Sequence, residues 1–180
     1  MTQAQFKVYL DSLPYDKYCQ DIEYLNFIGH SKSHITWNLI KDFIDWKNKK
    51  VADLGCFHGY YCFKIEELGG QATGFDKAPI VLETARKLNN IYNKNVSFVE
   101  WSGGELISSY YDVSLLISVL YRFDNKEKSL DNIKSRYLIC DIEPKEVYII
   151  KNFYNILDKK ESWGKETRRG IGEILFCERK

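Results

Sequence analysis

The sequence predicts an α/β fold with a doubly wound, mostly parallel seven-stranded sheet, an antiparallel C-terminal strand and preceding N-terminal helices. Short buried strands alternate with amphipathic helices from residue 51 onward, which is typical of parallel sheets covered on both faces. The last two strands have no crossover helix between them, so at least one must run antiparallel. We expect one domain over residues 1–180, with a helical N-terminal extension or lid over 1–50 and the sheet over 51–180.

The first fifty residues carry helical spacing of apolar side chains. Phe6, Tyr9 and Leu10 fit one helix, which the Leu13-Pro14 pair ends. A second helix is expected from about Tyr15 through Leu25, and a third over residues 37–46. The polar segment between them, residues 29–34, predicts a loop.

The remaining residues predict the sheet in order. Two glycines at 69–70 end the first helix, and Pro79 suits a helix first turn. The run VSLLISVL is the most apolar, as a strand buried on both faces should be. The predicted strands are Val51–Cys56, Ala72–Asp76, Val96–Trp101, Val113–Leu120, Tyr137–Ile142 and two within Glu161–Lys180, around Arg168-Arg169-Gly170. The predicted helices are Tyr60–Leu68, Ile80–Tyr92, a short one after Ser102-Gly103-Gly104, Lys126–Arg136 and one that Pro144 opens and that carries Val147, Ile150, Tyr154 and Leu157.

Composition narrows the classes of function. The formal net charge is +1, with 28% charged and 44% hydrophobic residues, which gives no general electrostatic reason to expect a polyanion partner. No apolar leader or membrane-spanning run is present, and the five cysteines form no CxxC pair. We therefore expect a cytoplasmic protein with reduced thiols, without a metal and without membrane contact.

The stretch VADLGCFHGYYCF, residues 51–63, predicts a strand, a glycine turn and a helix that hold a nucleotide-like ligand. A dinucleotide loop needs a glycine where Phe57 stands, and a phosphate-binding loop needs a Gly-Lys-Ser/Thr that is absent. A ligand without phosphates, contacted by the backbone and by Asp53, fits better.

These residues resemble the class I S-adenosylmethionine-dependent methyltransferases. Asp53–Gly59 matches that family's acid-x-Gly-x-x-x-Gly motif, and Asp76 stands where its second strand ends in an acid. The run Tyr111–Leu120 matches the fourth-strand motif. The resemblance extends from about Trp37 to Leu120, and it implies that residues 51–180 form a Rossmann-like cofactor-binding core.

The resemblance implies a set of S-adenosylmethionine contacts. Asp76 would accept from the ribose hydroxyls, Asp53 would lie near the methionine amino group, and Ser118 would line the methionine portion. Ser102 stands where the family often has an adenine-binding Asp, beside Trp101. The expected cofactor-binding residues are Asp53, Gly55, Cys56, Phe57, His58, Gly59, Asp76, Lys77, Trp101, Ser102 and Ser118.

Methyl transfer from a sulfonium is an in-line displacement that depends mainly on alignment and water exclusion. A base is needed where the acceptor carries a proton, and Tyr121, His30 and Glu143 are the candidate catalytic residues, with Asp141 also considered. For Asp141 and Glu143, capping of the helix that Pro144 opens is an equally good interpretation.

The acceptor is expected to be a small molecule, because the signatures of amino-group methylation on adenine or cytosine, the Pro-Cys pair of cytosine C5 methylation and an appended RNA-binding domain are missing. Two alternatives stay open. One is a compact RNA methyltransferase, since enzymes that modify tRNA wobble uridines have a similar first motif; its phosphate contacts would come from Lys159, Lys160, Lys165, Arg168 and Arg169. The other is a non-catalytic subunit that binds S-adenosylmethionine. The oligomeric state is left open.

Overall fold

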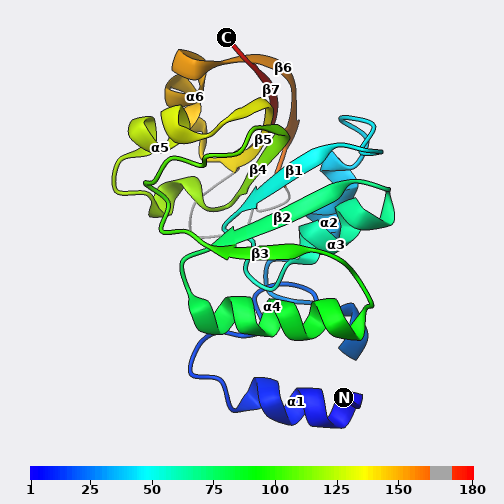
Figure 1. Cartoon of the computed structure of the whole chain (residues 1–180). Helices are drawn as coiled ribbons and strands as arrows, with labels where there is room; N and C mark the ends of the chain where they lie inside the picture. The colour runs from blue at the N-terminus through cyan, green and yellow to red at the C-terminus, as the bar shows by residue number, and fades with distance from the viewer. Residues whose placement is uncertain (163–171) are drawn as a thin grey trace.

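The computed structural model describes residues 1–162 and 172–180. Over these residues, seven strands form one sheet in the order β3-β2-β1-β4-β5-β7-β6 (Figure 1). Strands β1 to β5 run parallel, and β7 lies antiparallel between β5 and β6. The predicted fold class is confirmed. The strands are β1 Lys50–Leu54, β2 Gln71–Asp76, β3 Ser97–Glu100, β4 Tyr111–Ile117, β5 Ser135–Ile142, β6 Tyr154–Glu161 and β7 Glu173–Arg179.

Helices cover both faces of the sheet. In Figure 1, α5 and α6 lie together on one side, while α2, α3 and α4 lie on the other, with α1 packed beyond α4. The α-helices are α1 Gln3–Asp11, α2 Ser33–Ile40, α3 Tyr60–Glu67, α4 Pro79–Ile91, α5 Lys126–Asn132 and α6 Val147–Phe153. Short 3-10 turns are η1 Glu23–Leu25, η2 Leu120–Arg122 and η3 Pro144–Glu146.

Side-chain alternation along the strands divides the core into two apolar clusters. In β1, Val51 packs into the cluster that includes α1 to α4, whereas Ala52 packs into the cluster that includes α5 and α6. In β4, Leu115 and Leu116 divide in the same way. A sheet buried on both faces needs apolar residues at consecutive positions, which explains the unbroken apolar run of β4.

The N-terminal fifty residues contain less helix than predicted. Residues 15–25 were expected to be helical, but they contain only η1, which Asn26 ends in the left-handed region at φ 50°. The third helix, α2, ends at Ile40 rather than near Trp46. The buried carboxylate of Asp21 accepts from the backbone N–H of Gly29 at 2.7 Å, so side chains satisfy backbone groups that a helix would otherwise pair.

Two further element predictions were wrong. Tyr154 and Leu157 belong to β6 rather than to a helix, because that stretch pairs antiparallel with β7. The connection from β3 to β4 contains no helix among its described residues. The predicted turn at Arg168-Arg169-Gly170 lies outside the described residues. None of the described helices is long and apolar enough to cross a bilayer.

Candidate functional site

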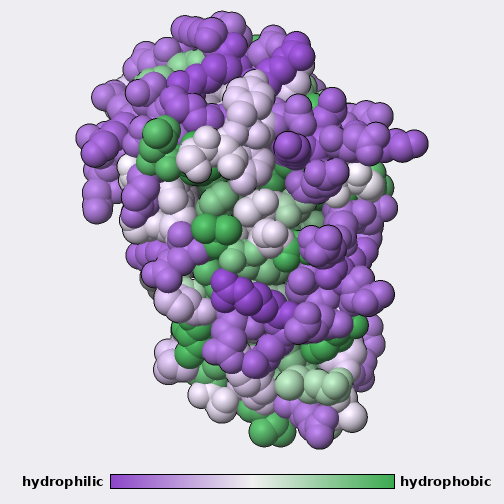
Figure 2. Space-filling model, in the orientation of Figure 1, coloured by the Kyte–Doolittle hydropathy of each residue, from purple (hydrophilic) through white to green (hydrophobic). Residues whose placement is uncertain are grey.

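A cavity of about 760 Å³ opens at the carboxyl ends of the parallel strands. This is the edge at which open α/β sheets bind ligands, and the volume suits a nucleoside-sized molecule. Figure 2 shows apolar and weakly polar residues gathered at the centre of one face, surrounded by hydrophilic residues. Lining residues named in the sequence prediction are His30, Gly55, Phe57, Asp76, Lys77, Trp101, Ser102, Ser118, Tyr121, Asp141 and Glu143.

The glycine turn after β1 forms the floor of the cavity. The N–H groups of Gly55 and Cys56 both donate to the carbonyl of Phe75, at 2.7 and 2.9 Å, which ties the turn to the end of β2. Gly55 has φ 81°, and a Cβ there would lie 2.7 Å from Val119 Cγ2. A side chain at this position would therefore clash with Val119, two residues beyond the end of β4.

Two backbone N–H groups fix the orientation of the Asp76 carboxylate. The N–H of Phe57 donates to its Oδ2 and the N–H of Ala78 to its Oδ1, both at 3.1 Å. Phe57 itself has φ 51°, an uncommon conformation for a residue with a side chain. Each carboxylate oxygen retains acceptor capacity, so the pair suits two vicinal hydroxyls such as those of a ribose. The fit to an adenosyl cofactor rests on this geometry.

Four predicted cofactor residues lie outside the cavity lining, namely Asp53, Cys56, His58 and Gly59. Asp53 is buried and accepts from Cys62 Sγ at 3.4 Å. Burial, with a contribution from Asp76, raises the pKa of Asp53 to about 7. These residues pack on the side of the turn away from the cavity. Their direct contact with a ligand stays a prediction.

His58 is buried beneath Phe57. Its Nε2 lies 2.9 Å from the hydroxyl of Tyr15, and its ring stacks on Phe57 at 4.0 Å between centroids. Burial lowers the pKa of His58 to about 3, so the ring is neutral near pH 7. Nδ1 has no hydrogen-bond partner. The structure thus gives His58 a role in connecting the turn to the N-terminal segment.

The end of the cavity near β3 is aromatic. Trp101 packs edge-on against Phe75 and Phe123, and its indole N–H donates to the carbonyl of Glu105 at 3.1 Å. The hydroxyl of Ser102 donates to the Glu105 carboxylate, which leaves the serine oxygen able to accept. An adenine amino group would find that acceptor here.

The opposite end, at β4 and β5, is polar. Ser118 follows β4 at φ 53°, and its hydroxyl donates to Asp141 Oδ2 at 2.6 Å. The Arg122 guanidinium lies over the ring of Tyr121, 5.0 Å from its centroid. Glu143 pairs with Lys145 at 2.6 Å.

The sequence prediction named His30 in the N-terminal segment but missed other lining residues that this segment supplies. Tyr15, Cys19 and Gln20 line the cavity, and Gln20 donates to the carbonyl of Cys56 at 3.2 Å while accepting from the N–H of Tyr60. His30 also lines the cavity and lies 3.5 Å from Asp16 with its side chain mostly exposed. No local pattern marks Tyr15 and Gln20, because their partners in the turn lie about forty positions away.

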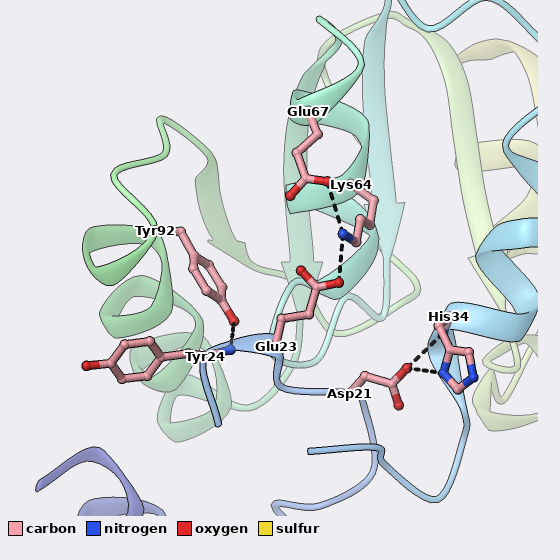
Figure 3. A network of polar contacts seen from close by, with 7 residues as sticks. All are labelled: Asp21, Glu23, Tyr24, His34, Lys64, Glu67 and Tyr92. Carbon is pink, nitrogen blue, oxygen red and sulfur yellow. Dashed lines mark hydrogen bonds and ion pairs between the residues drawn. The ribbon is translucent and has the colours of Figure 1, made fainter. Parts of the chain in front are cut away.

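A polar network fastens the same segment to the core (Figure 3). Glu23 pairs with Lys64 of α3 at 2.7 Å, and the N–H of Tyr24 donates to the hydroxyl of Tyr92 at 3.0 Å. Asp21 accepts from the backbone and ring nitrogens of His34. Residues 21–24 are therefore fastened to α2, to α3 and to the residue that follows α4.

The fold, the glycine turn and the carboxylate of Asp76 at the end of β2 are those of a class I S-adenosylmethionine-dependent methyltransferase. Residues 45–166 match the family described as "Methyltransferase domain", which covers more than half of the chain. The chain belongs to this family. Among the described residues, no group of side chains is placed to hold a metal ion.

Curated relatives are tRNA-modifying enzymes by name. The chain is 34% identical over 108 residues to the tRNA U34 carboxymethyltransferase of Campylobacter fetus, covering 58% of this chain and 38% of that protein. The corresponding protein of Helicobacter pylori is 31% identical over 130 residues, covering 69% and 49%. The chain thus spans less than half the length of these relatives.

Solved structures share the fold at low identity. The N-methyltransferase NodS of Bradyrhizobium japonicum superposes with a TM-score of 0.73 at 12% identity, covering 97% of this chain and 98% of that one. Magnesium protoporphyrin IX methyltransferase of Synechocystis gives 0.70 at 17% identity, covering 99% and 97%. At these identities the likeness shows the fold alone.

Proposed function

We propose that this methyltransferase modifies a nucleobase of tRNA. The observation that carries the proposal is the similarity to tRNA U34 carboxymethyltransferases at 31–34% identity. It favours the RNA alternative over the small-molecule acceptor that the missing signature motifs and RNA-binding domain suggested. Because the chain spans less than half of those relatives, its acceptor is inferred from them and tested below.

The polar end of the cavity suits a planar acceptor. Tyr121 offers a ring and Arg122 a guanidinium plane, stacked on each other, and Phe123 continues the lining toward Trp101. Single bases outside a helix are held by stacking on aromatic side chains and arginine planes. A base placed here would lie beyond the methyl group of a cofactor whose ribose is held by Asp76.

In this proposal, the residues of the chain align the cofactor with the acceptor and exclude water from the site. The bound sulfonium would supply the methyl group and a good leaving group. Asp76 and the glycine turn hold the cofactor, and residues 1–50 are proposed to serve as the lid, since Tyr15 and Gln20 pack onto the turn. Tyr121, His30 and Glu143 remain the proposed proton acceptors for an acceptor that carries a proton.

The test is a nucleoside digest of bulk tRNA after incubation with the protein and S-adenosylmethionine, followed by mass spectrometry. Wild type should produce a newly modified nucleoside. Asp76→Ala should bind the cofactor at least about tenfold more weakly, since two charge-assisted hydrogen bonds are lost, and should leave the tRNA unchanged. Cofactor binding by calorimetry without any modification of tRNA would contradict the RNA acceptor.

A small-molecule acceptor is the second candidate, and the charge of the chain favours it. The formal net charge is +1, and carboxylates outnumber Lys and Arg side chains among the described lining residues. A metabolite extract incubated with labelled S-adenosylmethionine would then yield a labelled small product. Salt-dependent tRNA binding would argue for the first candidate instead.

A further inference from the structure

The hydroxyl of Tyr15 joins the glycine turn to α4. It lies 2.9 Å from Nε2 of His58 in the turn and 3.0 Å from the hydroxyl of Thr84 in α4. His58 and Thr84 are both buried. Burial raises the pKa of Tyr15 to about 12, so the hydroxyl keeps its proton near pH 7 and can take part in both contacts as a neutral group.

The turn and α4 also supply the two N–H groups that bind Asp76. Phe57 comes directly before His58 in the turn, and its N–H donates to Oδ2 of Asp76 at 3.1 Å. Ala78 directly precedes α4, and its N–H donates to Oδ1 at 3.1 Å. The Tyr15 hydroxyl therefore bridges the two segments that carry these donors.

The ring of Phe57 contacts the rings of both Tyr15 and His58. It stacks on the imidazole of His58 with 4.0 Å between the centroids, and it meets the ring of Tyr15 edge to face at 5.9 Å. Phe57 has φ 51°, a conformation that a residue with a side chain keeps only where its surroundings require it. The two ring contacts are therefore part of what directs the Phe57 N–H at Asp76.

Tyr15 belongs to the N-terminal segment, between α1 and η1, and it lines the cavity together with Phe57 and Asp76. A second tyrosine of the N-terminal region offers a comparison. The hydroxyl of Tyr9 in α1 also lies 3.0 Å from the hydroxyl of Thr84, but its described contacts do not include the glycine turn. The two tyrosines thus share one partner and differ in whether they reach Phe57.

We propose that Tyr15 and His58 are positioning residues for the ribose site: they hold Phe57 so that its N–H keeps the Asp76 carboxylate turned toward the ribose hydroxyls of the cofactor. The inference rests on the proposed function for the role of Asp76, and it holds whichever acceptor is methylated. Both residues act through Phe57. Loss of either should therefore weaken a ligand that carries the ribose hydroxyls and spare a ligand that lacks them.

The test is calorimetric binding of two probes, S-adenosylhomocysteine and its 2′,3′-dideoxy analogue, with the weaker probe measured by competition against the tighter. Tyr15→Phe keeps a ring against Phe57 but removes the hydroxyl. It should bind S-adenosylhomocysteine about five- to tenfold more weakly than wild type, as expected when a charge-assisted hydrogen bond is partly lost. The dideoxy analogue should bind this variant and wild type within about twofold, and Tyr9→Phe should stay within about twofold for both probes.

Two further variants separate positioning from a general effect on the fold. His58→Gln removes the stacked ring and should show the same selective loss. In an Asp76→Asn background, Tyr15→Phe should change the affinity for S-adenosylhomocysteine by about twofold or less, because its effect passes through that carboxylate. Thermal melts show that each variant is folded at the temperature of the titration.

Three outcomes would contradict the inference. An equal loss for both probes in Tyr15→Phe would show a general effect on the fold and would overturn it. Unchanged binding of S-adenosylhomocysteine by Tyr15→Phe, where Asp76→Asn binds it more weakly, would remove the inference alone. If wild type does not bind S-adenosylhomocysteine, or Asp76→Asn binds it as tightly as wild type, the cofactor contact in the proposed function fails together with the inference.

Discussion

Two buried ionisable groups behind the glycine turn should give opposing contributions to the pH dependence of stability. Asp53 and His58 are each about 1% exposed. Burial raises the pKa of Asp53 from 3.8 to about 7 and lowers the pKa of His58 from 6.5 to about 3. Each group therefore differs strongly between the folded and unfolded chain over the range from pH 5 to 7.

The signs of the two contributions follow from proton binding. Between pH 4 and 7 the folded state holds a proton on Asp53 that the unfolded state has lost, so acidification stabilises the fold. Between pH 3 and 6.5 the unfolded state holds a proton on His58 that the folded state lacks, so acidification destabilises it. From pH 7 to pH 5, the Asp53 contribution rises by about 2 kcal/mol and the His58 contribution falls by about 2 kcal/mol.

Conservative variants should separate the two contributions. Relative to wild type, Asp53→Asn should lose about 2 kcal/mol of unfolding free energy between pH 7 and 5, and His58→Gln should gain about 2 kcal/mol. All other groups are shared, so the difference between variant and wild type isolates each contribution. Urea unfolding followed by tryptophan fluorescence at the two pH values measures it, with Asp124→Asn as an exposed control.

The refuting result is specific. If both variants keep the wild-type difference between pH 5 and 7, then neither group titrates as its burial requires. A change of the same sign in both variants would show that an altered fold, rather than opposing protonation, sets the pH dependence.

Other expected outcomes concern the glycine turn, the N-terminal segment packed on it and a glycine after β3. Tyr15→Phe removes the hydroxyl partner of His58 and Thr84 and should cost about 1–3 kcal/mol, whereas Tyr9→Phe removes a single bond to Thr84 and should cost about 0.5–1.5 kcal/mol. Equal losses in chemical denaturation would contradict this. Gly59→Ala places a Cβ 2.8 Å from the Phe98 ring at φ 85° and should cost about 2–4 kcal/mol. A Cβ at Gly104 would have no heavy atom within 4 Å, so Gly104→Ala should change stability by about 0.5 kcal/mol or less. Equal melting temperatures of the Gly59→Ala and Gly104→Ala variants would refute the argument.

The sheet could be predicted because its signals are local. Apolar runs of strand length, glycines after helices and an acid at the end of β2 are properties of short segments. The helix prediction for residues 154–157 failed because a short apolar stretch fits either period, and pairing with β7 decides between them. The helix prediction for the N-terminal segment failed for a related reason. Side chains such as Asp21 accept hydrogen bonds from backbone N–H groups several positions away, and the local pattern does not show this.

The site prediction shows a different limit. Six of the motif residues 53–59, all but Leu54, were expected to contact the cofactor, yet a chain that turns sharply cannot present so many neighbouring side chains to one cavity. Gly55 and Phe57 face the cavity, while Asp53 and His58 point into the core behind them. Side-chain direction in the turn depends on φ and ψ values that the motif spacing does not contain.

The two non-glycine residues with positive φ in the cavity lining, Phe57 and Ser118, support a common interpretation. Each conformation costs about 1–2 kcal/mol relative to the ordinary helical region, and such costs persist where the surrounding structure requires them. The N–H of Phe57 holds Asp76, and the hydroxyl of Ser118 holds Asp141. Phe57 follows β1 and Ser118 follows β4, the two strands at which the sheet order reverses. Each strained residue therefore orients one carboxylate, Asp76 at one end of the cavity and Asp141 at the other. This links backbone strain to the alignment that methyl transfer requires.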